Sequence, residues 1–174
     1  MADHAAWEGD WELLHGAAVA MTPSPFGPHT ERLSRLAAAL WNAIDAAGSR
    51  ATVLAEIDWI VADDTVVRPD LVVVCGPAPR QHVEHPPALV VEILSAATRE
   101  RDLAVKRDLY ETRGVGWYLI VDPDGAESSL LRLGPNGRYE PLPADGRHEI
   151  DLCPECTVVV DLTTPTSPPS STRP

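Results

Sequence analysis

The sequence has few basic side chains and almost no lysine. Of its 14 basic residues, 13 are arginines and one is a lysine, Lys106, and they stand against 26 acidic residues. The formal net charge of −12 argues against loose, charge-driven binding of nucleic acid, because the long-range field repels phosphate. A nucleic-acid function would therefore require a local site with its own cations.

Long hydrophobic runs are also missing. No apolar segment approaches the ~20 residues that span a bilayer, so we expect no membrane partner. The first residues, MADHAAWEGDWELL, contain neither a basic region nor an apolar core, so we expect no secretory signal. Cysteine is scarce as well: three residues are too few for a disulfide scaffold, and they indicate a reducing, cytoplasmic location.

Hydrophobic residues nevertheless make up 44% of the 174, which excludes global disorder and suits one domain of average size. We expect a single domain over residues 1–162. The segment 163–174, with sequence TTPTSPPSSTRP, cannot contribute to a core and is predicted to be a disordered tail.

The order of the predicted elements is typical of an α/β (α+β) domain with a mixed sheet flanked by helices. We predict a hairpin that turns at His15-Gly16, then the proline-rich, structure-breaking segment TPSPFGP, and then a helix from Pro28 to Gly48. Strands follow at 51–61, 66–75, 88–94 and 117–122, with a helix at 98–113 before the last of them. Short strands that form a meander complete the domain. Because the second helix joins two apolar strands, it predicts a parallel crossover.

Two acidic residues interrupt apolar strands: Asp70 lies within RPDLVVV and Glu92 within ALVVEIL. A buried ionised carboxylate is costly unless it is paired or binds a metal. The loop between the strands covers 75–87, so antiparallel pairing about its midpoint, residue 81, places the two carboxylates opposite each other on one face. Such a pair supplies two oxygen ligands to Mg²⁺. The alternative is an edge position from which each acid reaches solvent or an arginine such as Arg68.

The single lysine is predicted to point inward. At about 100° per residue along 98–113, Lys106 lies on the same side of the helix as the apolar residues Leu103, Leu109 and Tyr110. Arg99, Asp102 and Arg113 share that side. The opposite, solvated face is formed by Glu100, Arg101, Arg107, Asp108 and Glu111. The helix directly follows the strand that holds Glu92, so the ammonium can face the carboxylates. The alternative is an ordinary ion pair between Lys106 and Asp102.

These residues carry a resemblance to a known family. TVVRPDLVVV, followed by PALVVEILSAATRERDLAVKRDLYETRGVGWYLIVDP, resembles the Uma-two family of Uma-type endonucleases, in the PD-(D/E)xK restriction-endonuclease-like superfamily. The match runs from the first hairpin to about Leu162 and is dense between Val66 and Pro123. The resemblance implies a restriction-endonuclease-like core and metal-dependent cleavage of DNA phosphodiester bonds.

The resemblance also implies roles for individual residues. Asp70 and Glu92 would be catalytic ligands of Mg²⁺ or Mn²⁺, joined by the Ile93 carbonyl. The superfamily's lysine stands two residues after the glutamate, where this chain has Leu94, but in Uma-type sequences it lies on the following helix, which matches Lys106.

Four further residues are supporting candidates. His29 matches a family position near the site, and Glu56 is a weaker candidate for the same neighbourhood. Asp102 and Tyr110 share the helix side of the lysine. Ala96 departs from the family, which usually has proline there, and this affects the turn between strand and helix.

Several alternatives stay open at this point. The chain could keep the nuclease fold without turnover and serve as a binding or structural module. DNA is the expected substrate, and the partner could also be a second copy in a homodimer. Finally, Cys153-Pro-Glu-Cys156 has zinc-knuckle spacing and could combine with His82-Val-Glu-His85 in a Cys₂His₂ site.

Overall fold

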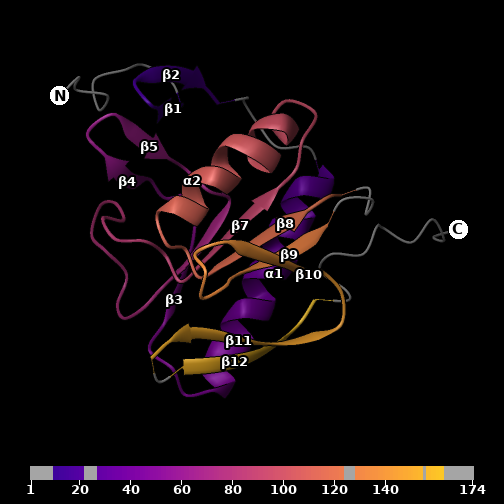
Figure 1. Cartoon of the computed structure of the whole chain (residues 1–174). Coiled ribbons are helices and arrows are strands. Elements are labelled where there is room, and N and C mark those ends of the chain that lie inside the picture. Colours follow the sequence, from indigo (N-terminus) through magenta and orange to yellow (C-terminus); the bar gives the residue numbers. More distant parts are fainter. Residues whose placement is uncertain (1–9, 22–26, 124–127, 155, 163–174) are drawn as a thin grey trace, which may run out of the picture.

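A six-stranded mixed sheet forms the centre of the computed structural model, which describes residues 10–21, 27–123, 128–154 and 156–162 (Figure 1). Its strands, in the order β10-β9-β8-β7-β6-β3, are β3 (Thr52–Ala55), β6 (Leu71–Val74), β7 (Leu89–Ile93), β8 (Trp117–Val121), β9 (Ser129–Leu133) and β10 (Tyr139–Pro143). The strands β7 and β8 pair in parallel, and the other neighbours pair antiparallel. The predicted mixed sheet and parallel crossover are confirmed.

The helical connection between β7 and β8 differs from the single α-helix that we predicted. A π-helical segment, η2 (Arg101–Lys106), runs directly into α2 (Arg107–Thr112). In a π-helix the hydrogen bonds run from residue i to i+5, so the angular spacing of side chains changes. The faces assigned at 100° per residue are therefore wrong for part of this helix.

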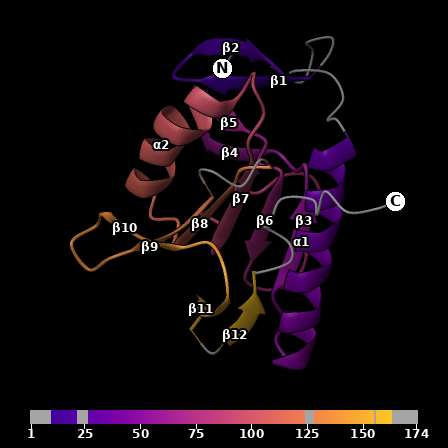
Figure 2. The ribbon, with the colours of Figure 1, turned by 90° about the vertical axis from the view of Figure 1, so that its right-hand side faces the viewer.

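The first helix, α1 (Gly27–Ala46), forms as predicted. Leu36, Leu40 and Ile44 recur at helical spacing and are buried against one face of the central sheet. Gly48 follows the helix with φ +61°, a conformation that glycine adopts without strain. Figure 2 shows α1 and α2 on opposite sides of the sheet.

Side chains of the central strands alternate between two cores, one on each face of the sheet. Leu71, Val91 and Ile93 belong to the core under α1, whereas Val72 and Val90 belong to the core under α2. The residue between Val91 and Ile93 is Glu92, so its side chain enters the α2 side of the sheet.

A second sheet contains the N-terminal hairpin. It has the order β2-β1-β5-β4 and comprises β1 (Trp11–Leu14), β2 (Ala17–Ala20), β4 (Trp59–Ala62) and β5 (Thr65–Val67). The hairpin turns at His15-Gly16, as predicted. The predicted strands 51–61 and 66–75 are each divided in two, because one half of each joins the central sheet and the other half joins this one. The breaks contain Glu56, with φ +49°, and Pro69, which has no N–H to donate.

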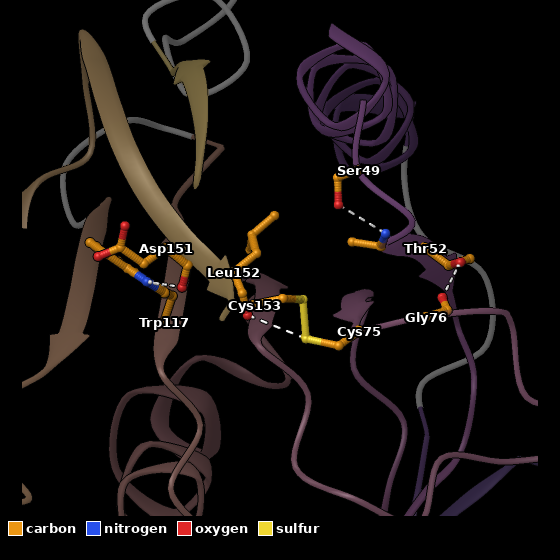
Figure 3. The surroundings of a disulfide bond; sticks show 9 residues. Ser49, Thr52, Cys75, Gly76, Trp117, Asp151, Leu152 and Cys153 are labelled. Carbon is orange, nitrogen blue, oxygen red and sulfur yellow. Dashed lines mark hydrogen bonds between the residues drawn. A yellow bond between two sulfur atoms is a disulfide. The ribbon is translucent and has the colours of Figure 1, made fainter. Parts of the chain in front are cut away.

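The third sheet is the hairpin β11 (Arg147–Cys153) and β12 (Cys156–Asp161), whose alternate residues enter the core under α1. A disulfide between Cys75, after β6, and Cys153 ties it to the central sheet (Figure 3). Cys156 is a buried free thiol. A disulfide was not expected from so few cysteines, and the zinc hypothesis fails because Cys153 is already bonded.

Some predictions concern parts of the chain outside the described residues. These are residues 22–26 of the predicted breaker and the tail at 163–174. The extent of the domain, 1–162, stays a prediction. None of the helices in the described ranges combines the length and apolar character needed to cross a bilayer.

Candidate active site

The strands β6 and β7 bring the two predicted carboxylates to one end of the sheet. The observed pairs, Leu71 with Val91 and Val73 with Leu89, are centred on residue 81, which confirms the predicted register. Asp70 immediately precedes β6, and its Oδ2 accepts a 2.6 Å hydrogen bond from the Ile93 N–H. Asp70 and Glu92 both line one cavity of about 430 Å³.

Glu92 is buried on the α2 side, with 3% of its surface exposed. Its Oε1 accepts hydrogen bonds from Lys106 Nζ at 2.9 Å and from the Tyr110 hydroxyl at 2.7 Å. Burial raises the pKa of Glu92 well above its usual range, although the charge of Lys106 opposes this shift. In the described part of the chain both hydrogen bonds end on Oε1, so neither uses Oε2.

Lys106 is buried and points toward the carboxylates, as predicted. Its Nζ lies 2.9 Å from Glu92 Oε1, 2.8 Å from Glu12 Oε1 and 3.5 Å from Asp102 Oδ1. Burial by itself would lower the pKa of Lys106, but the three carboxylates outweigh it and raise the pKa. The ammonium therefore keeps its charge in the interior, and the Asp102 ion pair is the longest of its three contacts.

Asp102 belongs to the same buried cluster. Burial raises its pKa, and Lys106 opposes the shift. Tyr110 also faces Glu92, and burial, followed by the charge of Glu92, raises the pKa of its hydroxyl well above the usual value. Tyr110 is thus a hydrogen-bond donor to Glu92 rather than a proton source.

His29 approaches the site from the first turn of α1. Its Nε2 lies 3.3 Å from Asp70 Oδ1. Burial lowers the pKa of His29, but the hydrogen bond and charge of Asp70, with a smaller contribution from Glu56, raise it overall. Glu56 lines the same cavity. All the predicted site residues except Tyr110 line this one cavity, and Tyr110 contacts it indirectly through its hydrogen bond to Glu92.

Two charged residues of the cavity, Glu12 and Arg101, were not predicted to lie there. Glu12, in β1, is 1% exposed and contacts Lys106, and Arg101 lines the cavity instead of lying on the solvated face. The signal for Glu12 was present, because WELL interrupts an apolar strand with an acid just as ALVVEIL does. Arg101 was misplaced because η2 is not α-helical, and Arg113, assigned to the inner side, is exposed.

The alternative of an edge position near Arg68 is not observed. Arg68 lines the same cavity as Asp70, but its Nε binds Asp58 Oδ1 at 2.7 Å and its Nη1 binds Asp10 Oδ1 at 2.6 Å. These hydrogen bonds, opposed by burial, raise the pKa of Arg68 further. Arg68 therefore joins the N-terminal segment to β5.

The donor set fits a hard divalent cation. Asp70, Glu92 and the Ile93 carbonyl supply oxygen atoms, which Mg²⁺ and Mn²⁺ prefer. Among the residues that the structure describes, no three or more His, Cys, Asp or Glu side chains are grouped as a metal cage. Mg²⁺ is usually held by one or two carboxylates with several waters retained.

The fold and the cavity together define a class: a restriction-endonuclease-like α+β domain with paired carboxylates and a buried lysine. Among solved structures, the chain is similar to one described as "a putative nuclease belonging to DUF820 from Anabaena variabilis ATCC 29413", with a TM-score of 0.67, 18% identity, and coverage of 83% of each chain. At this identity the likeness shows the fold.

The family follows from the sequence match. The model of the Uma2 family, described as "Putative restriction endonuclease", matches residues 2–164, and the chain belongs to this family. A comparison with curated proteins finds no match. The predicted family and fold class are confirmed.

Proposed function

We propose that this protein is a metal-dependent endonuclease that hydrolyses DNA phosphodiester bonds. The observation that supports this best is the β6–β7 register, which brings Asp70 and Glu92 to one cavity. The ammonium of Lys106 donates a hydrogen bond to the Glu92 carboxylate there. Acids at that position have a use as metal ligands, whereas a purely structural strand pair gains nothing from two neighbouring carboxylates.

Asp70, Glu92 and the Ile93 carbonyl would hold Mg²⁺ or Mn²⁺, which, when bound, activates a water and polarises the phosphoryl oxygens. The chain's own residues orient these ligands. Lys106 and Tyr110 fix Glu92 through Oε1, and the Ile93 N–H fixes Asp70 through Oδ2. Lys106 also places a positive charge at the cavity, where negative charge accumulates on the phosphate during hydrolysis.

His29 has a supporting role in this proposal. It contacts Asp70 through Oδ1, the oxygen that the Ile93 N–H does not use, and its raised pKa favours the charged imidazolium. A cation at that position limits the repulsion between Asp70 and Glu92.

The test is nicking of supercoiled plasmid, with Asp70→Asn as the variant and Asp45→Asn, an exposed carboxylate of α1, as the matched control. Wild type and Asp45→Asn should nick in Mg²⁺ and not in EDTA, and Asp70→Asn should lose activity by about a hundredfold or more. Equal nicking by Asp70→Asn and wild type would contradict the proposal. Calorimetric Mg²⁺ binding without nicking would instead favour a binding module.

A further inference from the structure

The proposed chemistry does not use Glu12, although its carboxylate is one of the most deeply buried charges. Oε1 accepts the backbone N–H of Arg68 at 3.0 Å and lies 2.8 Å from Lys106 Nζ. Oε2 lies 3.8 Å from Arg101 Nε. One carboxylate from β1 therefore faces two cations of the same helix, and Figure 2 shows the β1–β2 hairpin beside that helix.

The π-helical segment explains how both cations reach Glu12. Arg101 and Lys106 are the first and last residues of η2, five positions apart. Residues i and i+5 lie about one turn apart in a π-helix, on the same side, whereas five residues of an α-helix leave them about 140° apart. An α-helix that points Lys106 at Glu92 would turn Arg101 away from the cavity.

Arg101 lines the cavity, where Glu12 is its ion-pair partner at 3.8 Å. Its side chain is 18% exposed and lines the same cavity as Asp70 and Glu92. Its Nε is buried and has no hydrogen-bond acceptor among the described residues, because the Glu12 contact is too long for a hydrogen bond. A guanidinium is always charged and presents a planar set of donors that matches the oxygens of a phosphate.

We infer that Arg101 is a phosphate-binding residue of this cavity and that Glu12 is its positioning residue, holding Arg101 and Lys106 on one side of η2. The ligand would be a non-bridging oxygen of a phosphodiester, so the inference rests on the proposed DNA substrate. Arg101 and Lys106 would then be the local cations that a chain with a net charge of −12 needs to accept a polyanion.

The first measurement is the affinity for a short fluorescent DNA duplex in EDTA, by anisotropy over a range of salt concentrations. Arg101→Gln should weaken binding about tenfold and reduce the slope of log K against log salt by about one, as expected for one lost phosphate contact. The matched control is Arg113→Gln, which removes the same charge from an exposed position at the end of α2 and should behave as wild type.

The second measurement tests the role of Glu12 with a double-mutant cycle. If Glu12 acts by holding Arg101, Glu12→Gln should weaken DNA binding, and the double variant should bind no more weakly than Arg101→Gln alone. Glu12→Asp should restore part of the loss. Lys106 is the single lysine, so its ¹³Cε signal needs no assignment. The signal should shift in Glu12→Gln because an ion-pair partner is lost, and it should stay distinct from the signal of the urea-unfolded protein if the variant is folded.

The outcomes separate this inference from the proposed function. Equal affinity and salt slope for Arg101→Gln and Arg113→Gln, or multiplicative effects of Glu12→Gln and Arg101→Gln, would overturn the inference even if the wild type nicks plasmid. No DNA binding by the wild type would overturn it as well. If the Arg101, Arg113 and Glu12 variants bind DNA as expected but the wild type shows no Mg²⁺-dependent nicking, the phosphate site is supported and the proposed nuclease activity is contradicted.

Discussion

Two outlying hairpins are attached to the central sheet in different ways. The β1–β2 hairpin meets the helix between β7 and β8 through buried charges, chiefly Glu12 with Lys106. The β11–β12 hairpin instead contributes alternate apolar side chains, such as Ile150 and Val158, to the core under α1, and the Cys75–Cys153 disulfide closes its end.

The difference separates stability from chemistry. Buried ion pairs give little net stability, because desolvation of the charges offsets most of their attraction, but they fix the positions of charged groups. Apolar burial and a disulfide stabilise a fold without presenting any group to a substrate. We therefore expect changes at the β1–β2 end to affect both function and stability, and changes at the β11–β12 end to affect stability alone.

The largest effect is expected from Lys106→Met. The substitution keeps the apolar volume but leaves Glu12, Glu92 and Asp102 without their shared cation, which should lower the free energy of unfolding by about 4–5 kcal/mol. Urea denaturation measures the loss. Lys106→Arg, which retains a charge, is the control and should lose less; equal losses would show that charge is not what the site requires.

The disulfide should contribute nearly as much at the other end. It closes a loop with a sequence separation of 78, so Cys75→Ser should destabilise the protein by about 4 kcal/mol on the chain-entropy model. Because the β11–β12 end is expected to affect stability alone, folded Cys75→Ser should nick plasmid at the wild-type rate. Cys156→Ala, at the unbonded cysteine, is the control, and a nicking defect in folded Cys75→Ser would break the proposed separation.

Tyr110→Phe tests a single hydrogen bond within the charged cluster. It removes the 2.7 Å bond to Glu92 Oε1 while retaining the ring, so we expect a loss of about 2 kcal/mol, as for a hydrogen bond to a charged group. Thermal unfolding measures the loss of stability. The comparison variant is Tyr139→Phe, which removes a hydrogen bond from a tyrosine hydroxyl to a neutral acceptor, the Val115 carbonyl. The prediction is contradicted if Tyr139→Phe costs more.

The smallest effect is expected at Glu111, where the charge lies near the surface. Its carboxylate accepts hydrogen bonds from the Tyr139 N–H and from Arg138, and these lower its pKa. A carboxyl group whose pKa is lower in the folded than in the unfolded state stabilises the fold at pH values above its unfolded pKa of about 4.3. This stabilisation is lost as the pH falls through the folded-state pKa. Glu111→Gln should therefore cost about 1 kcal/mol at pH 7, and the difference from wild type should vanish at low pH in urea titrations.

Local patterns predicted much of the fold and the centre of the site. The hairpin at His15-Gly16, the apolar face of α1 and the β6–β7 register depend on residues close in sequence, where spacing translates directly into geometry. The inward direction of Lys106 was also predicted correctly, because the residue lies only 14 positions after Glu92 in the sequence.

What the sequence did not predict depends on how distant segments dock. Glu12 and Lys106 meet only because β1 pairs with β5, at Leu13 and Val66, and places the hairpin beside the helix. Cys75 and Cys153 likewise meet only when β11 packs on the sheet. The π-helical turn has no periodicity of its own to detect in a segment this short, so the face of Arg101 could not be read from the sequence.

The burial of the single lysine has a practical consequence. Apart from the amino terminus, Lys106 carries the only amine of the chain, and in the folded state it is enclosed by carboxylates. Because Lys106 is buried and paired with carboxylates, acylation of its amine should be slow in the folded protein and should accelerate when this cluster opens. The protein thus contains a built-in chemical probe, located at its charged centre, that needs no engineered label.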